Sequence, residues 1–171
     1  MNKCVFLDRD GVINKDRPNY VYEPEQLVIH EGVKEAIIKL KNAGYMTIVI
    51  TNQSGVDKGI YTERHVATIH QLISEHVGYM IDDFYYCITH RDFTNSLARK
   101  PGSLMFEKAI AKYDIDTDHS WMVGDRLRDL EPASSLNIRG ILLHNEYGDM
   151  HQGMYAGNLS EAVDKYILTS I

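Results

Sequence analysis

The sequence predicts an α/β fold: a doubly wound, mostly parallel sheet with helices on both faces and no large cap domain. Short apolar runs alternate with segments of helical periodicity along the chain, the pattern of successive strand–helix units. Polar loops rich in Asp, Asn, Pro and Arg interrupt this pattern at residues 9–30 and 88–99. At 171 residues and 44% hydrophobic content, the chain suits one domain, expected over residues 1–171.

Five apolar runs are the expected strands. They are CVFL, MTIVI, FYYCI, SWMV and GILL, which begin at residues 4, 46, 84, 120 and 140. Each is four or five residues long and bounded by polar or glycine-containing segments, as expected of strands in a sheet covered on both faces.

The segments between these strands have apolar residues three and four positions apart, which predicts helices. The expected helices cover residues 33–44, 62–78, 104–113, 127–137 and 159–168. Gly44 is a typical residue just past a helix C-terminus, and Glu63 favours the start of the second helix. Pro132 should enter its helix early or kink it, and Ser160 or Asn158 should cap the last helix.

Composition favours a small-molecule enzyme. The net charge of −6 comes from dispersed acids, and no Lys and Arg cluster indicates a nucleic-acid partner. Cys4 and Cys87 are expected to be buried free thiols, because two cysteines are too few for a disulfide-stapled secreted fold. The sequence has no signal-peptide core or apolar stretch long enough for a bilayer, so we expect a cytoplasmic monomer with no membrane partner.

The most informative segment is FLDRDGVIN, in which an apolar strand ends in Asp8 and is followed by Asp10 and Gly11. The carboxyl edge of an open parallel sheet is where ligands bind, because the loops diverge there. An Asx turn with two solvated acids is the alternative, and an Asp-Gly pair alone would favour it. The rest of the chain therefore decides between the two.

Polar residues follow two further strands in the same way, and a lysine precedes a helix. TIVITNQSG ends in Thr51, Asn52, Gln53 and Ser54, WMVGDRLRD places Asp125 and Asp129 after Gly124, and RKPGS contains Lys100. In this order, the set resembles the four motifs of the haloacid dehalogenase superfamily, and the match spans nearly the whole chain. Four motifs in order at strand ends would rarely arise by chance.

The resemblance implies a Rossmann-like fold and a Mg²⁺-dependent phosphatase. Mg²⁺ would be held by Asp8, Asp125 and the backbone carbonyl of Asp10, and it would offset the repulsion between a phosphate and a nucleophilic carboxylate. Asp8 would form an aspartyl-phosphate, and Asp10 would act as acid and then as base. Thr51 and Lys100 would hold the transferring oxygens.

Within the superfamily, DRDGVIN, TNQSG, RKP and GDRLRD are most similar to the heptose bisphosphate phosphatases and the related histidinol-phosphate phosphatases, which lack a large cap. No segment between Gly11 and Gly44, or between Ser54 and Phe84, is long enough to form a cap. The resemblance implies removal of the C7 phosphate of D-glycero-D-manno-heptose 1,7-bisphosphate. Histidinol phosphate or another small sugar phosphate is the alternative substrate.

In that family the loop before RKP commonly binds a structural zinc through three cysteines and a histidine. Here Cys87 stands at the first position, but Thr89, Ser96 and Ala98 stand at the others. Even with His90 as a substitute, two soft ligands fall short of the four that a closed zinc site needs. Structural zinc is therefore not expected.

Substrate-binding residues are expected in the loops. Arg99 resembles the arginine that recognises a remote phosphate in the heptose enzymes, although a surface arginine beside Lys100 is the alternative. Asp16, Arg17, Asn19 and Tyr20 align loosely with a sugar-contacting stretch. The remaining candidates are Asn52, Gln53, Ser54 and Arg126.

A receiver-like phospho-acceptor module is the runner-up from another class, because receivers also combine a strand-end Asp, Mg²⁺, a Thr and a Lys. Asp10 argues against it, since a receiver has no use for a general acid two residues after its phosphorylated Asp. A catalytically inactive sugar-phosphate binder is disfavoured because every chemical position is filled.

Overall fold

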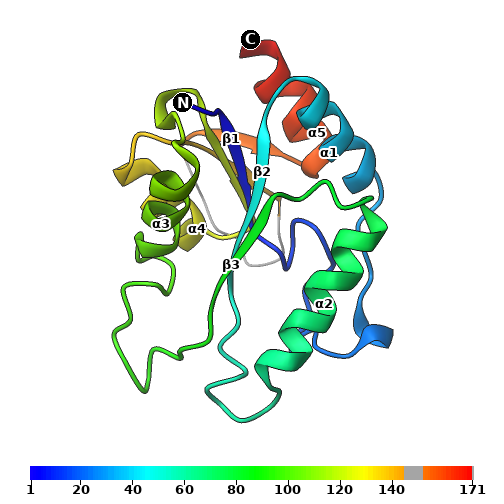
Figure 1. Cartoon of the computed structure of the whole chain (residues 1–171), viewed down its shortest axis with the longest axis vertical. Helices are drawn as coiled ribbons and strands as arrows, with labels where there is room; N and C mark the ends of the chain where they lie inside the picture. Colours follow the sequence, from blue (N-terminus) through cyan, green and yellow to red (C-terminus); the bar gives the residue numbers. More distant parts are fainter. Residues whose placement is uncertain (145–151, 171) are drawn as a thin grey trace.

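A computed structural model describes residues 1–144 and 152–170. Its centre is a six-stranded sheet in the order β3-β2-β1-β4-β5-β6 (Figure 1). Each neighbouring pair of strands is parallel. The strands are β1 (Cys4–Leu7), β2 (Met46–Asn52), β3 (Asp83–Cys87), β4 (Trp121–Gly124), β5 (Arg139–Leu143) and β6 (Met154–Ala156).

Helices cover both faces of this sheet (Figure 1). One face carries α1 (Val33–Asn42), α2 (Glu63–His76) and α5 (Leu159–Ala162), and the other carries α3 (Leu104–Tyr113) and α4 (Leu127–Ser135). The shorter turns are η1 (Pro24–Gln26), η2 (Thr117–His119), η3 (Val163–Ile167) and η4 (Leu168–Ser170). The doubly wound α/β class predicted from the sequence is therefore confirmed.

Side-chain alternation along β1 divides the core into two layers. Val5 and Leu7 pack in the layer with α1, α2 and α5, whereas Cys4 and Phe6 pack in the layer with α3 and α4. All four side chains are fully buried, because successive residues of a strand point to opposite faces and both faces are covered. Cys87 lies with the second layer, and both cysteines are free and buried.

The chain order reverses beside β1, which has β2 on one side and β4 on the other. In the register of the sheet, Leu7 pairs with Val49 of β2 and with Val123 of β4. The residues that follow these three strands therefore meet at one point of the carboxyl edge. Such a switch point leaves a crevice in an open α/β sheet, and the functional loops gather there.

The helix predictions differ from the structure in details. α3 has the predicted bounds, and the side chain of Asn158 accepts a hydrogen bond from the Glu161 backbone to cap α5. Pro132 lies inside α4, and the predicted closing helix is divided into α5, η3 and η4. The α2 cap uses His65, whose Nδ1 accepts from the Thr62 backbone N–H at 3.0 Å.

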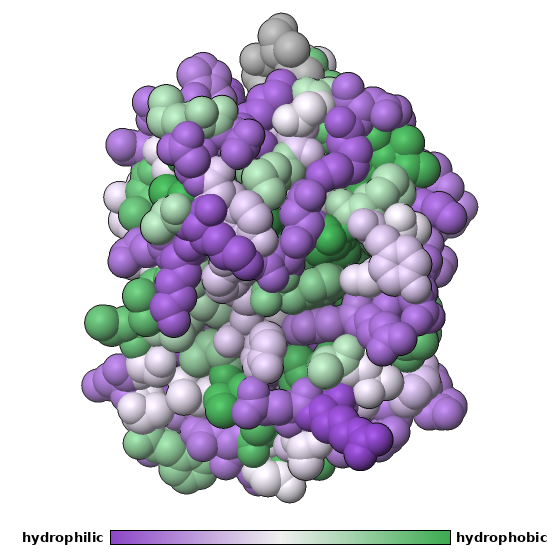
Figure 2. Space-filling model, in the orientation of Figure 1, coloured by the Kyte–Doolittle hydropathy of each residue, from purple (hydrophilic) through white to green (hydrophobic). Residues whose placement is uncertain are grey.

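The sequence prediction missed β6, a three-residue edge strand. Within residues 1–144 and 152–170, no second sheet or large inserted cap is present. Hydrophilic residues cover much of the face in Figure 2, and hydrophobic ones form small separate groups. Among the helices that the structure describes, none has the length and apolar content needed to cross a bilayer. The single-domain boundary stays a prediction.

Candidate active site

Three buried carboxylates meet at the switch point, and we call Asp8, Asp125 and Asp129 the carboxylate floor. Each offers an oxygen that lies within 4.8 Å of the other two. Asp8 follows β1, Asp125 follows β4, and Asp129 belongs to the first turn of α4. Their exposed fractions are 6%, 4% and 0%, so solvent does little to screen the repulsion among them.

Two glycines allow these carboxylates to approach the backbone. A Cβ atom at Gly11 would lie 2.3 Å from Oδ2 of Asp125, and Gly11 has a positive φ of 88°. A Cβ atom at Gly124 would lie 2.5 Å from Cβ of Asp129. A larger residue at Gly11 or Gly124 would have to displace a floor carboxylate, so the site requires glycine at both positions.

Lys100 is the buried cation that faces the floor. Its Nζ lies 2.8 Å from Oδ1 of Asp8 and 2.8 Å from Oδ1 of Asp129, and it donates to the Ile50 carbonyl at 2.6 Å. Burial alone would lower the pKa of Lys100, but Asp129 and Asp8 outweigh it and raise that pKa. Lys100 is therefore a fixed positive charge in the site.

One lysine does not balance three buried carboxylates. Burial raises the pKa of Asp8 to about 7 against the opposing effect of Lys100. Burial, and then the charges of Asp8 and Asp129, raise the pKa of Asp125 to about 8. Buried carboxylate oxygens whose ionisation is opposed by burial and by one another suit a hard divalent cation such as Mg²⁺, so the donor set fits this metal.

Asp10 lies beside the floor and accepts four hydrogen bonds that orient its side chain. Its Oδ1 accepts from Arg9 and Asn14, and its Oδ2 accepts from Arg9 and Gln53, at 2.9 to 3.1 Å. Burial alone would raise the pKa of Asp10, but Arg9 and these hydrogen bonds lower it. The side chain is thus committed to its own partners, and a contribution of Asp10 to a metal would come from its backbone carbonyl.

The residues at the end of β2 and directly after it have different surroundings. The Asn52 side chain pairs with the backbone of Lys100 through two hydrogen bonds of 3.0 and 3.1 Å, which joins this strand end to the start of α3. Thr51, Asn52 and Ser54 line the cleft above the floor. Gln53 does not line it, because its side chain is buried beside Asp10 and Thr51. The structure thus separates Gln53 from the other predicted substrate contacts.

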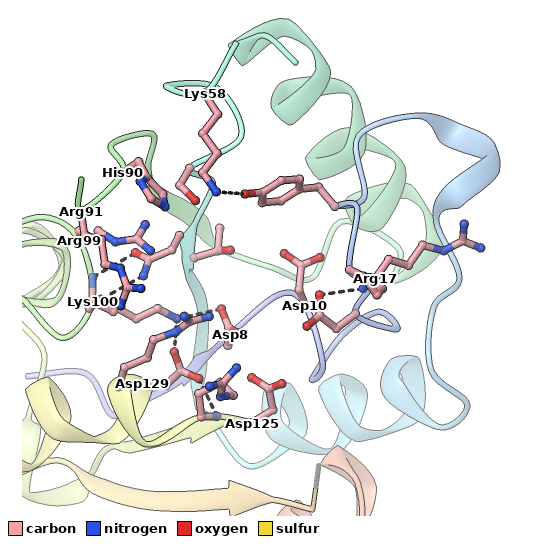
Figure 3. Close-up of a pocket in the computed structure, with 18 residues that line it drawn as sticks. Asp8, Asp10, Arg17, Lys58, His90, Arg91, Arg99, Lys100, Asp125 and Asp129 are labelled. Carbon is pink, nitrogen blue, oxygen red and sulfur yellow. Dashed lines mark hydrogen bonds and ion pairs between the residues drawn. The ribbon is translucent and has the colours of Figure 1, made fainter. Parts of the chain in front are cut away.

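The cleft has a volume of about 430 Å³ and a strongly basic margin. We call its six margin cations the basic rim: Arg17, Lys58, Arg91, Arg99, Arg126 and Arg128. Figure 3 shows the floor at the base, Arg91 and Arg99 on one side and Arg17 on the opposite side. Lys58 spans the upper part, where it donates to the Tyr20 hydroxyl at 3.0 Å.

Arg99 is held in the rim by a hydrogen bond to the backbone. Its Nη1 donates to the Thr89 carbonyl at 2.9 Å. Burial lowers the pKa of Arg99, and the nearby Arg128 lowers it further. Arg91, Arg99 and Arg128 also border a second cavity of about 440 Å³ beside the cleft. Positive charge is thus concentrated on this side of the cleft, where an anion would relieve it.

Residues 88–99 place two hydroxyl groups beside the Cys87 thiol. The Cys87 Sγ lies 3.0 Å from Oγ1 of Thr89 and 4.0 Å from Oγ of Ser96. His90 belongs to the cleft lining instead, and its backbone N–H donates to Asp57. Neutral hydroxyls are poor zinc ligands, and the absence of structural zinc stays a prediction.

Comparisons with known proteins agree with this geometry. The HAD-hydrolase-like family model matches residues 97–158. A Helicobacter pylori D-glycero-β-D-manno-heptose-1,7-bisphosphate 7-phosphatase is 32% identical over 95% of this chain and 96% of its own length. A Chlorobaculum tepidum D-glycero-D-manno-heptose-1,7-bisphosphate 7-phosphatase is 33% identical over 97% of this chain and 94% of its own length.

A solved structure gives the same result. The D,D-heptose 1,7-bisphosphate phosphatase of B. bronchiseptica, complexed with magnesium and phosphate, has a TM-score of 0.89 and 26% identity, and the match covers 99% of each chain. The chain belongs to the haloacid dehalogenase-like phosphatases. Phosphatases of this family use Mg²⁺, which agrees with the donor set of the carboxylate floor.

Most of the residues predicted for this haloacid dehalogenase-like phosphatase converge on one cleft. They are Asp8, Asp10, Asp16, Tyr20, Thr51, Asn52, Ser54, Arg99, Lys100, Asp125 and Arg126. Asp16 also accepts a hydrogen bond from the Arg17 backbone at 2.8 Å. Arg17 lines the cleft too, whereas Gln53, which lies behind the cleft wall, and Asn19 are not part of its lining.

Sequence reasoning gave no role to several residues of this phosphatase site. Asp129 joins the floor, and its position one helical turn after Asp125 was the available signal. Arg9 is 1% exposed and holds Asp10, and its place between two acids was a weaker signal. No local pattern distinguishes Lys58 or Arg128 from ordinary surface cations, because only the tertiary structure brings them to the cleft.

Proposed function

We propose that this phosphatase removes the C7 phosphate of D-glycero-D-manno-heptose 1,7-bisphosphate through an aspartyl-phosphate on Asp8. The observation that carries the proposal is the presence of a nucleophile cluster and an arginine cluster in the same cleft. A bisphosphate needs both, one for the phosphate that reacts and one for the phosphate that does not. The names of the curated relatives support this substrate.

Asp8, Asp125 and the backbone carbonyl of Asp10 would hold Mg²⁺, with Asp129 as a neighbouring carboxylate. When bound, Mg²⁺ neutralises charge and lets a phosphate dianion approach the floor. Lys100 is fixed by Asp8 and Asp129, so it is positioned to hold a transferring oxygen. Thr51, at the end of β2, offers a hydroxyl to another.

In the first step an Asp8 oxygen attacks phosphorus, the bond from phosphorus to the sugar oxygen breaks, and Asp10 protonates the leaving oxygen. In the second step water attacks the same phosphorus and gives its proton to Asp10, which releases phosphate and restores Asp8. Arg9 and the other donors keep Asp10 ionised in the free protein, which suits the second step. A bound phosphate dianion would bias Asp10 toward the protonated form needed in the first.

The unreacted phosphate would lie against the side of the rim that contains Arg99 and Arg128. Arg99 offers a planar guanidinium already held through Thr89, which reduces the entropy lost on binding a phosphate. Tyr20 and Asp16, on the loop after β1, would contact the sugar. Ser54 and Arg126 line the same cleft and complete the proposed binding set.

The alternative substrate is histidinol phosphate or another small sugar monophosphate, which would leave the arginine side of the rim unpaired. A receiver-like module is disfavoured by the four donors that maintain Asp10 beside the floor. The proposal also includes a monomeric cytoplasmic enzyme with no nucleic-acid or membrane partner.

Rates of phosphate release test the proposed substrate. We expect kcat/KM for the heptose 1,7-bisphosphate to exceed that for histidinol phosphate, heptose 7-phosphate and nucleotides, because only the bisphosphate occupies both ends of the cleft. Product analysis by ³¹P NMR should show the phosphate remaining at C1. A preference for histidinol phosphate, or equal rates for the mono- and bisphosphate, would reject this substrate and keep the phosphatase assignment.

A further inference from the structure

A buried hydrogen-bonded chain connects Tyr61 to two residues of the reaction site. The Tyr61 hydroxyl donates to Oε1 of Gln53 at 2.8 Å. The Gln53 Nε2 donates to Oδ2 of Asp10 at 3.0 Å and to Oγ1 of Thr51 at 2.9 Å. Tyr61 and Gln53 are 4% and 1% exposed, so water does not compete for these groups.

The direction of each hydrogen bond follows from the chemistry of the partners. An ionised carboxylate only accepts, so the Gln53 amide must present its nitrogen to Asp10. Its oxygen then faces Tyr61, and burial raises the pKa of the Tyr61 hydroxyl to about 12, which keeps its proton in place for donation. The second Nε2 proton goes to Thr51, whose oxygen must therefore accept.

The consequence for Thr51 is specific. A hydroxyl that accepts from Gln53 keeps its own single proton free for another acceptor. Thr51 lines the cleft above the floor, so that acceptor would be a phosphoryl oxygen. With the opposite amide orientation, the Thr51 proton would be used on the Gln53 oxygen and lost to the substrate.

We propose that Gln53 and Tyr61 are positioning residues that fix the hydrogen-bond direction at Thr51 and the orientation of Asp10. This inference rests on the proposed roles of Thr51 and Asp10 in phosphoryl transfer. Neither residue touches substrate, since Gln53 and Tyr61 lie outside the cleft lining. They act by preorganising a donor and an acid–base group before the phosphate arrives.

Local packing holds Tyr61 in place for this role. A Cβ atom at Gly55 would lie 2.1 Å from the Tyr61 ring, so a glycine is required where the ring crosses the backbone. The ring stacks on Tyr22 with centroids 5.1 Å apart and meets Tyr20 edge-on at 5.6 Å. Tyr20 lines the cleft, so the same aromatic group supports the loop after β1.

Three variants distinguish the contributions of the individual hydrogen bonds. Tyr61→Phe removes the hydroxyl that donates to the Gln53 oxygen and so supports the amide orientation that Asp10 dictates. Gln53→Met removes all amide hydrogen bonds at similar size, and Gln53→Glu keeps an acceptor for Tyr61 but lacks the Nε2 donor. Tyr22→Phe is the matched control, because it removes a hydroxyl from the same aromatic stack without a contact to Gln53. Thermal unfolding of each variant measures its structural cost.

Turnover and binding of inorganic phosphate to the Mg²⁺-loaded protein are measured together. We expect kcat to fall about fivefold for Tyr61→Phe and on the order of tenfold or more for Gln53→Met, with weaker phosphate binding in both. Gln53→Glu should be the least active, because it places a second carboxylate beside Asp10. The Tyr22→Phe control should stay within about twofold of the parent in both measurements.

Two results with the variants would overturn the proposal. One is Gln53→Glu activity and phosphate affinity equal to those of the parent. The other is a Tyr61→Phe protein indistinguishable from Tyr22→Phe in both measurements.

NMR of the unmodified protein gives a test that needs neither turnover nor a variant that folds. Both Gln53 side-chain amide protons should be protected from solvent exchange, and rapid exchange would contradict the chain of hydrogen bonds. Failure of the parent to release phosphate from any ester would reject the proposed function and leave this NMR result standing.

Discussion

The carboxylate floor and the basic rim lie in one cleft but differ in how firmly they are held. Floor residues are at most 6% exposed, Lys100 pairs with Asp8 and Asp129, and the backbone packs so closely on the floor at Gly11 and Gly124 that neither position has room for a Cβ atom. Rim contacts are more exposed, such as the hydrogen bond from Lys58 to Tyr20. Removing a buried partner leaves an uncompensated charge, whereas an exposed contact contributes little to stability. Packing thus fixes the positions of the floor residues, whereas the rim residues that would recognise the substrate can vary with the loops.

The largest expected effect is on the floor, where Asp8→Asn should abolish turnover. An amide is a poor nucleophile, and the substitution also removes a charge from the proposed metal site. Steady-state and single-turnover assays with Mg²⁺ measure the loss. Because Asn removes repulsion between buried carboxylates, the metal-free variant should unfold at the same temperature as the parent or higher. Near-normal turnover would contradict the assignment of Asp8 as nucleophile.

Asp10→Asn should slow hydrolysis by roughly a hundredfold or more, because acid and base assistance is lost. Magnesium binding, measured by calorimetry, should persist, since the proposed Asp10 ligand is a backbone carbonyl. The variant should also be less stable, because Arg9 is 1% exposed and would lose its carboxylate partner. If turnover were unchanged, the acid–base role would move to another group.

Arg99→Ala tests the rim. We expect kcat/KM for the heptose 1,7-bisphosphate to fall roughly tenfold to a hundredfold, as for a lost charge-assisted contact. A monophosphate should be affected little, because Arg99 does not contact the floor. Arg99→Lys, which keeps the charge without the planar fork, should recover part of the loss. Equal losses on both substrates would mean that Arg99 supports Lys100 or the loop instead of recognising a phosphate.

The metal-free protein should lose stability as pH rises from about 4 to about 8. The folded-state pKa values of Asp8 and Asp125 lie at about 7 and 8, above their usual values, so the folded state binds more protons in this range. Thermal unfolding in EDTA at several pH values measures the slope. Asp125→Asn should flatten it, while Asp118→Asn, at an exposed acid in η2, should not. Added Mg²⁺ should stabilise the protein more at pH 8 than at pH 5.

The smallest expected effect concerns zinc. Elemental analysis of protein purified without added zinc should give well under one zinc per chain. EDTA should stop activity, and Mg²⁺ alone should restore it. Stoichiometric zinc would show that residues 88–99 bind metal despite Thr89 and Ser96 beside Cys87.

Local sequence patterns were sufficient for most of the fold. The periodicity of residues 104–113 predicted the bounds of α3, and five apolar runs gave β1 to β5. β6 was missed because a three-residue edge strand of intermediate burial has little alternation to detect. Asn158 capped the last helix as predicted, but the division after α5 depends on packing of the chain end.

The motifs along the chain already specify Asp8, Thr51 and Asp125 at the ends of strands and Lys100 before a helix. Only the tertiary structure decided that Asp129 completes the floor, that Gln53 lies behind the wall, and that the rim cations gather around one cleft. The reason is physical. Strand ends are fixed by local periodicity and sheet register, whereas the direction of a loop side chain depends on partners such as Tyr61 and Tyr20, which come from other segments of the chain.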